Sequence, residues 1–88
     1  MAVVRKKILP KFFEAVLSGK KNYELRLNDF DISEGDTLIL EEINEKTRER
    51  TGRTIEKVVT RVGRFKIDEL FWPREEILEK GLQIISFN

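Results

Sequence analysis

Cysteine and histidine are both absent from this chain of 88 residues. Their absence excludes disulfide bonds, thiolate catalysis and zinc sites built on thiolate or imidazole ligands. It also removes the side chain that most often serves as a general base near neutral pH. Any chemistry must therefore come from Lys, Asp, Glu, Ser, Thr or the single tyrosine, Tyr23. We expect no metal ion and no cofactor.

A long hydrophobic run is missing too, since the chain has no stretch of about 18 apolar residues of the kind that spans a membrane. The apolar stretch within residues 1–9 is too short for a signal peptide. These absences favour a cytoplasmic protein with no membrane partner. The length favours one domain over residues 1–88, with one modest core, and we expect a monomer.

Charged residues, by contrast, make up 38% of the chain, a share that is typical of thermophile proteins, although small domains vary widely in composition. Lys and Arg outnumber Asp and Glu by seven to two in residues 1–28 and by six to one in residues 50–66. Acids lead by eight to two in residues 29–49 and by five to two in residues 67–88. Either the two basic blocks meet and form a face that attracts phosphate, or basic and acidic blocks pair across a sheet.

Hydrophobic periodicity predicts five short strands and two helices. The first helix begins at Pro10, where a missing N–H costs nothing, and ends at Gly19, which suits a left-handed cap. A weaker helix runs from Pro73 through Leu78 and stops at Gly81. Strands are expected over residues 3–9, 22–27, 37–43, 53–62 and 82–87, with turns at Ser33-Glu34-Gly35-Asp36 and Thr51-Gly52. This set indicates an α+β fold, a small mixed β-barrel with flanking helices.

The stretch Gly19-Lys20-Lys21-Asn22-Tyr23-Glu24-Leu25-Arg26 concentrates charge at the corner between the first helix and the second expected strand. Alternation along that strand puts Glu24 and Arg26 on one polar face and turns Tyr23 toward the core. Lys20 and Lys21 lie at the corner itself. Such a cluster suits a small polar ligand, with Glu24 orienting the cations or pairing with neighbouring strands instead.

The corner motif Gly19-x-Lys21-x-x-Glu24-x-Arg26 resembles the signature of the ASCH family, whose fold is a PUA-like β-barrel with flanking helices. Phe12-Phe13-x-Ala15-Val16 is similar to the family's helix, and Ser33-Glu34-Gly35-Asp36-Thr37-Leu38 is similar to the turn that opens its next strand. Thr51-Gly52-Arg53 and Gly81-Leu82-Gln83-Ile84-Ile85 also fit. The resemblance covers nearly the whole chain, and residues 66–80 match least.

This resemblance implies a cleft lined by Lys21, Glu24 and Arg26 that binds RNA or a nucleotide-like ligand. Some small ASCH proteins hydrolyse the acetyl amide of N4-acetylcytidine, so an amidohydrolase is the alternative, with Lys21 as base and Glu24 in support. Glu24 occupies the position of that branch's nucleophilic threonine, and a carboxylate is a poor substitute for a hydroxyl that must be acylated. Thr54 and Thr60 are hydroxyls without an assigned role.

Two further features extend the set of candidate binding residues. Phe71 and Trp72 precede Pro73, and they either form a stacking platform for a base or plug one end of the barrel. Arg53 closes a loop that is rich in cations and either contacts a nucleic-acid backbone or forms a solvated hairpin tip. The full set of expected ligand or RNA contacts is Lys20, Lys21, Glu24, Arg26, Arg53 and Trp72. A third possibility is a protein-interaction module.

Overall fold

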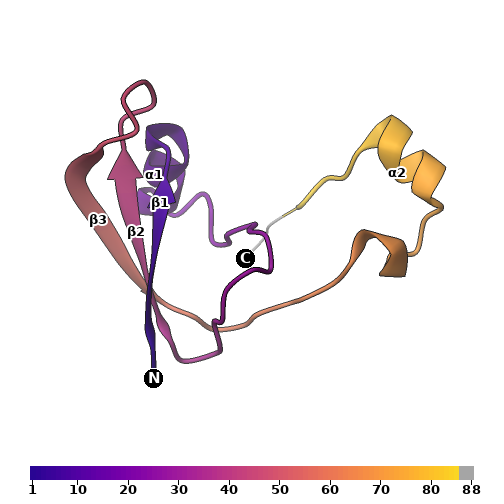
Figure 1. Cartoon of the computed structure of the whole chain (residues 1–88), viewed down its shortest axis with the longest axis horizontal. Helices are drawn as coiled ribbons and strands as arrows, with labels where there is room; N and C mark the ends of the chain where they lie inside the picture. The colour runs from indigo at the N-terminus through magenta and orange to yellow at the C-terminus, as the bar shows by residue number, and fades with distance from the viewer. Residues whose placement is uncertain (86–88) are drawn as a thin grey trace.

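A three-stranded mixed sheet with one helix packed on it forms the body of the chain in the computed structural model, which describes residues 1–85 (Figure 1). β1 (Val3–Ile8) pairs in parallel with β2 (Thr37–Ile43), and β2 pairs antiparallel with β3 (Arg50–Val58). Helix α1 (Pro10–Leu17) lies between β1 and β2 in the chain; a 3₁₀ turn, η1 (Ile67–Glu69), and α2 (Arg74–Lys80) follow the sheet. The α+β class is confirmed.

Helix α1 begins and ends where the sequence predicts. Pro10 stands in its first turn, after an extended Leu9. Gly19 has a φ of 81°, a left-handed conformation that glycine adopts without steric cost. The N–H of Gly19 donates to the carbonyl of Val16 (3.1 Å), and the N–H of Lys21 donates to that of Ala15 (3.0 Å). The chain therefore leaves the helix in a fixed direction.

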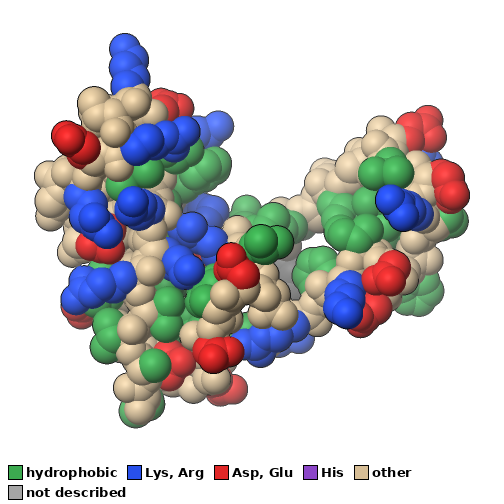
Figure 2. All heavy atoms as spheres, in the orientation of Figure 1, with side chains coloured by type: hydrophobic (Ala, Val, Ile, Leu, Met, Phe, Trp, Pro, Cys, Tyr) green, Lys and Arg blue, Asp and Glu red, His purple; other side chains and the backbone are tan. Residues whose placement is uncertain are grey.

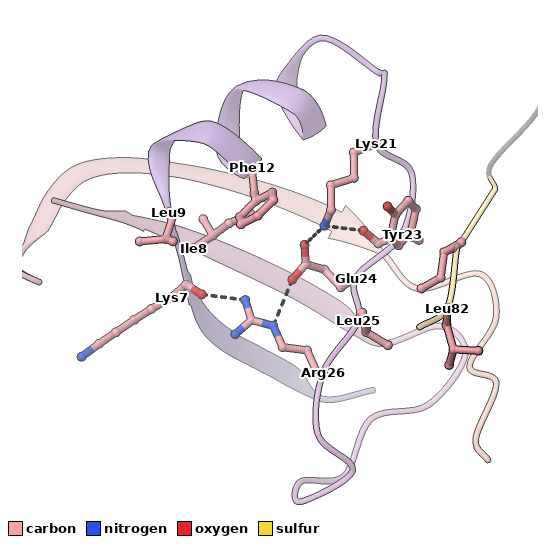
Figure 3. A pocket seen from close by; sticks show the side chains of 11 residues that line it. Lys7, Ile8, Leu9, Phe12, Lys21, Tyr23, Glu24, Leu25, Arg26 and Leu82 are labelled. Atoms are coloured by element: carbon pink, nitrogen blue, oxygen red, sulfur yellow. Dashed lines mark hydrogen bonds and ion pairs between the residues drawn. The ribbon is translucent and has the colours of Figure 1, made fainter. Parts of the chain in front are cut away.

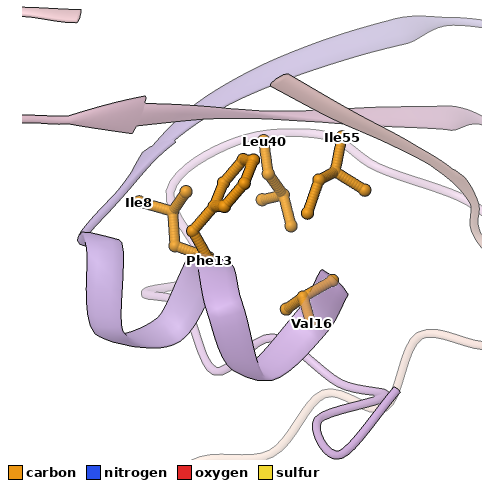
Figure 4. Close-up of a cluster of buried hydrophobic side chains, with 5 residues drawn as sticks. All are labelled: Ile8, Phe13, Val16, Leu40 and Ile55. Atoms are coloured by element: carbon orange, nitrogen blue, oxygen red, sulfur yellow. The ribbon is translucent and has the colours of Figure 1, made fainter. Parts of the chain in front are cut away.

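The core lies between α1 and one face of the sheet. Phe13 and Val16 from the helix contact Ile8, Leu40 and Ile55, one residue from each strand (Figure 4). Leu40, in the central strand, is only 1% exposed. Full burial of each such side chain stabilises the fold by about 1.5–3 kcal/mol, so these five residues hold the helix on the sheet.

The hairpin between β2 and β3 differs from the prediction. Its turn lies at residues 44–49, where the side chain of Asn44 accepts hydrogen bonds from the N–H groups of Lys46 and Thr47. Gly52 is not in the turn but inside β3, with a φ of 95°, at a break in the pairing register. A glycine at positive φ is typical of a β-bulge. β3 therefore begins at Arg50 rather than at residue 53, and it ends at Val58 rather than at residue 62.

Two of the five expected strands are not formed in the described chain. Residues 22–27 form no strand; this segment contacts β1 through the side chain of Arg26, which donates to the Lys7 carbonyl. Residues 82–85 form no strand either, and residues 86–87 of that prediction lie outside the described residues. Residues 1–85 thus form an open three-stranded sheet, not a closed five-stranded barrel.

Beyond β3 the chain leaves the body and forms a projecting lobe, residues 67–80, which contains η1 and α2 (Figure 1). Helix α2 follows Pro73 and ends at Gly81, close to the prediction. No residue of either element is buried. Phe71 is 99% exposed, so the expectation that Phe71 and Trp72 plug a barrel is wrong. The radius of gyration, 14.9 Å, exceeds the value of about 12 Å for a compact domain of this length.

Candidate functional site

Lys21, Glu24 and Arg26 form one connected cluster at the corner after α1 (Figure 3). The Lys21 ammonium donates to Glu24 Oε1 (2.5 Å) and to the Tyr23 carbonyl (2.8 Å). Arg26 Nε donates to the other carboxylate oxygen of Glu24 (2.9 Å). Lys21 and Glu24 are largely buried, with side chains 13% and 15% exposed, whereas Arg26 is 32% exposed. The carboxylate thus orients both cations, as one of the sequence hypotheses proposed.

The cluster is anchored at both ends. Its first member, Lys21, is tied to the end of α1 by its own backbone N–H, which donates to the Ala15 carbonyl. Its last member, Arg26, donates through Nη2 to the Lys7 carbonyl on β1 (2.6 Å). The irregular segment between helix and sheet is therefore held by side-chain hydrogen bonds instead of a strand ladder.

A corner pocket of about 520 Å³ opens over this cluster, within the usual range for small-molecule sites. Its lining is Lys7, Ile8, Leu9, Phe12, Lys21, Tyr23, Glu24, Leu25, Arg26, Leu82 and Ile84. The Lys21 ammonium lies 5.7 Å from the centre of the Phe12 ring and 4.8 Å from that of Tyr23. Tyr23 is 39% exposed, so the prediction that it points into the core is wrong; its ring is a wall of the pocket.

Hydrogen-bond donors remain available in the corner pocket after the internal bonds are counted. The ammonium of Lys21 has three N–H bonds and uses two, while the guanidinium of Arg26 has five and uses two. Two cations and one carboxylate leave the cluster with a net positive charge. The pocket therefore offers directed donors beside apolar and aromatic walls, which suits a ligand with acceptor oxygens and a flat apolar body.

A larger groove of about 860 Å³ adjoins the corner pocket and shares residues 21 and 23–26 with it. Seven cations line it, and Glu24 is its one acidic residue among those the structure describes. These cations come from both basic blocks of the sequence: Lys6, Lys21, Arg26, Lys57, Arg61, Arg64 and Lys66. The two basic blocks thus meet in space, as one of the two hypotheses on charge predicted.

The second hypothesis on charge holds at the hairpin end of the sheet. Arg53 donates to both carboxylate oxygens of Glu42 (3.1 and 2.9 Å) and to Glu14 of α1, and it stacks on Phe13 at 4.4 Å. These bonds, with one from Thr51, hold the pKa of the buried Glu42 carboxyl below its ordinary value. The two carboxylates raise the pKa of Arg53 in turn.

The structure does not bring every predicted binding residue to the corner. Lys20 is exposed, and Trp72 lies on the projecting lobe, 57% exposed. Neither residue, nor Arg53, lines the corner pocket or the groove. Conversely, Phe12 and Lys57 line these spaces and were not predicted to do so. The basic block over residues 50–66 was the available signal for Lys57.

The hydroxyl groups give no nucleophile at the corner. Among the described residues, the lining of the corner pocket contains neither Ser nor Thr. Thr60 lines the larger groove, whereas Thr54 lines neither space. A search of the described residues for three or more acidic side chains able to hold a metal ion finds no such group. No helix in this part of the chain is long and apolar enough to cross a membrane.

Comparison with known proteins gives a family match. A family model described as a domain of unknown function (DUF3850) matches residues 5–71, which is more than half of the chain. That range includes most of β1, all of α1, β2 and β3 and the whole corner cluster, and it stops within the lobe. No curated protein and no solved structure matches the chain.

Proposed function

The chain belongs to the DUF3850 family, and we propose that it is an ASCH-type module that binds RNA or a nucleotide-like ligand in the corner pocket. The observation that carries this proposal is the largely buried pair of Lys21 and Glu24, joined to Arg26 and roofed by two aromatic rings. A largely buried ion pair beside a pocket of this size is more typical of a binding site than of a solvated surface.

Each member of the cluster has a distinct role in this proposal. Arg26 is the more exposed cation and presents its remaining N–H groups as a planar fork, which fits phosphate or the edge of a base. Lys21 supplies a single directed donor to a carbonyl or phosphate oxygen. Glu24 holds both cations in place, and the rings of Phe12 and Tyr23 give a base an apolar surface to lie against.

The larger groove favours a nucleic-acid strand as the ligand over a mononucleotide alone. The side chains of Lys57, Arg61 and Lys66 line the groove and make no hydrogen bond or ion pair within the described chain. Cations along a groove that continues from a base-sized pocket are typical of proteins that bind single-stranded nucleic acid. Apart from Glu24, no acidic residue of the described chain lines the groove, so the overall net charge of +1 conceals this basic track.

The relation to PUA-like barrels is part of the same proposal. It is supported by the corner motif at the end of α1 and by the Ser33–Asp36 turn. In that turn, the Asp36 carboxylate accepts hydrogen bonds from the N–H groups of Ala2 (3.0 Å) and Ser33 (2.8 Å). These bonds hold the beginning of β1 beside the beginning of β2. Asp36 therefore helps to place the two parallel strands beside each other.

An amidohydrolase acting on an acyl-modified nucleoside is the alternative proposal. Lys21 and Glu24 would be its catalytic groups, with a water molecule as the nucleophile. The absence of a Ser or Thr hydroxyl from the described lining of the corner pocket favours binding over hydrolysis through an acyl-enzyme. Incubation with N4-acetylcytidine, followed by chromatography, tests this alternative directly, since release of cytidine would establish it.

The binding proposal is tested by titrating fluorescently labelled RNA, single-stranded and duplex, with the protein and its variants. We expect Lys21→Ala and Arg26→Ala each to weaken binding of single-stranded RNA by about tenfold, as loss of one charge-assisted contact does. Lys20→Ala is the matched control, because it removes the same charge from an adjacent exposed residue outside the pocket. Equal losses from all three variants would indicate only nonspecific attraction, and no binding by the unmodified protein would refute the proposal.

A further inference from the structure

The projecting lobe is an apolar surface that nothing in the described chain covers. Phe71, Trp72 and Leu78 are 99%, 57% and 74% exposed, and the first two are adjacent in the chain. In Figure 2 hydrophobic side chains of the lobe border the hollow between it and the sheet. Large apolar side chains gathered in this way mark an interaction surface rather than an ordinary solvated face.

The accessible surface area of the chain indicates how large an interface it could form. The accessible surface of the chain is 7634 Å². A compact monomer of 10.4 kDa exposes about 5,400 Å², so the chain has an excess of about 2,200 Å². Burial of most of this excess from each of two copies falls in the range of about 2,000–5,000 Å² for obligate homodimers.

Charge indicates where the lobe binds. The lobe carries five acids and two bases: Asp68, Glu69, Glu75, Glu76 and Glu79 against Arg74 and Lys80. The larger groove carries seven cations and one acid, and exposed apolar side chains such as Leu27, Val58 and Phe65 line it with them. An acidic, apolar lobe and a basic, apolar groove are complementary in both properties.

We propose that the chain forms a two-fold dimer in which the lobe of each copy occupies the larger groove of the other. The lobe projects away from its own sheet (Figure 1). The segment of residues 59–66 that leads to it is itself a wall of the groove. Exchange between two copies requires no change in the direction of the lobe. Docking of the lobe in the groove of its own chain requires residues 59–66 to fold back. A two-fold axis gives both lobes the same contact with a groove.

The dimer also gives Trp72 a place at the binding site. Within one chain Trp72 lies outside both the corner pocket and the groove. In the exchanged dimer the lobe of the second copy carries its own Trp72 into the groove that adjoins Lys21 and Arg26. The lobe and an RNA strand then compete for the groove cations, so RNA reaches the groove in the monomer and only the corner pocket in the dimer. This last consequence rests on the nucleic-acid function proposed above; the dimer itself does not.

Fluorescence of the unmodified protein gives the first test, because Trp72 is the only tryptophan. As the protein concentration rises, we expect its emission to shift to shorter wavelength while the mass from light scattering doubles from 10.4 kDa. A monomeric mass at every concentration would overturn the proposal, and a concentration-independent emission of a buried tryptophan would then assign the lobe to its own groove.

Charge reversal gives the second test and separates exchange from self-docking. Variant one carries Lys57→Glu and Arg61→Glu in the groove, and variant two carries Glu69→Lys and Glu79→Lys on the lobe; all four positions are exposed. Like charges then face each other in either homodimer, so each variant alone should self-associate at least about tenfold more weakly. An equimolar mixture should restore the dimer, because each groove then meets a lobe of opposite charge.

Every other result contradicts the proposal. Variants that remain dimeric alone would place the interface elsewhere, and a mixture that stays monomeric would exclude exchange. Far-UV circular dichroism of each variant verifies folding, and the milder pair Lys57→Gln and Arg61→Gln replaces variant one if needed. RNA titration of the unmodified protein keeps the two proposals distinct. Binding that Lys21→Ala and Arg26→Ala weaken, by a protein that stays monomeric at every concentration, would sustain the function and reject the exchange.

Discussion

The sheet body, residues 1–58, buries a core of apolar side chains, whereas the projecting lobe, residues 67–80, leaves its large apolar side chains exposed. All seven buried hydrophobic residues of the described chain belong to the body: Ile8, Phe13, Val16, Ile39, Leu40, Ile43 and Ile55. The lobe has none, although it contains Phe71 and Trp72. In the body, the apolar face of α1 packs against the apolar face of the sheet within one chain. Helix α2 has seven residues and no element of the described chain to bury it.

The strongest test of this difference compares two leucines. Leu40→Ala should lower the free energy of unfolding by about 2–5 kcal/mol, because it leaves a cavity in the core beneath α1. Leu78→Ala on the lobe should change it by less than about 0.5 kcal/mol in dilute protein. Urea denaturation, followed by circular dichroism, measures both.

Protein concentration sharpens the same comparison. If the lobe is buried only in a dimer, the cost of Leu78→Ala should grow as concentration rises, while that of Leu40→Ala stays constant. A large cost for Leu78→Ala in the most dilute samples would instead mean that the lobe packs within its own chain, and the distinction between body and lobe would fail.

The second test uses acid. Interactions with Arg53 and Thr51 lower the pKa of Glu42 from its ordinary 4.5, and those with the N–H groups of Ala2 and Ser33 lower that of Asp36 from 3.8. A carboxyl with a lowered pKa stabilises the fold fully above its unfolded value, and this stabilisation is lost as pH falls through the folded value. The body should therefore lose stability progressively below pH 4.5.

Substitution assigns that loss to particular groups. Glu42→Gln should lower stability at neutral pH by less than Leu40→Ala does, and should flatten the acid-induced loss below pH 4.5. Glu75→Gln on the lobe is the control, because the side chain of Glu75 makes no hydrogen bond or ion pair within the described residues. Thermal unfolding between neutral pH and about pH 3 provides the measurement. An unchanged pH profile in Glu42→Gln would show that the interactions of Glu42 with Arg53 and Thr51 do not contribute to the loss of stability in acid.

The contrast between body and lobe also explains which predictions from sequence succeeded. β2 was predicted at residues 37–43 and lies there, and α1 begins at Pro10, because apolar periodicity reports packing inside one chain. β3 was misplaced because Gly52 indicates a turn and a bulge equally well. Periodicity carries no information on a partner outside the chain, so it could not reveal that Phe71 and Trp72 stay exposed.

The corner cluster shows a subtler limit of the same reasoning. Alternation correctly put Glu24 and Arg26 on one side of the chain, and they pair at 2.9 Å. It wrongly implied a strand, because a two-residue period describes side-chain direction and not the hydrogen bonds of the backbone. The Lys7 carbonyl that anchors Arg26 belongs to a residue 19 positions away, and no local pattern could have identified it.

Two glycines offer the smallest and cleanest test, since added methyl groups meet nothing within 4 Å at either Gly52 in the body or Gly63 in the segment before the lobe. They differ in backbone: Gly52 has a φ of 95°, whereas Gly63 is outside the positive-φ region. Gly52→Ala should therefore cost about 1–2 kcal/mol, and Gly63→Ala should be neutral or stabilise by up to about 1 kcal/mol by restricting the unfolded chain. Urea denaturation of both variants at one low protein concentration decides it. If both substitutions changed the free energy of unfolding equally, the bulge in β3 would not be held as firmly as the rest of the body. The boundary between the body and the lobe would then lie before Gly52 instead of after Val58.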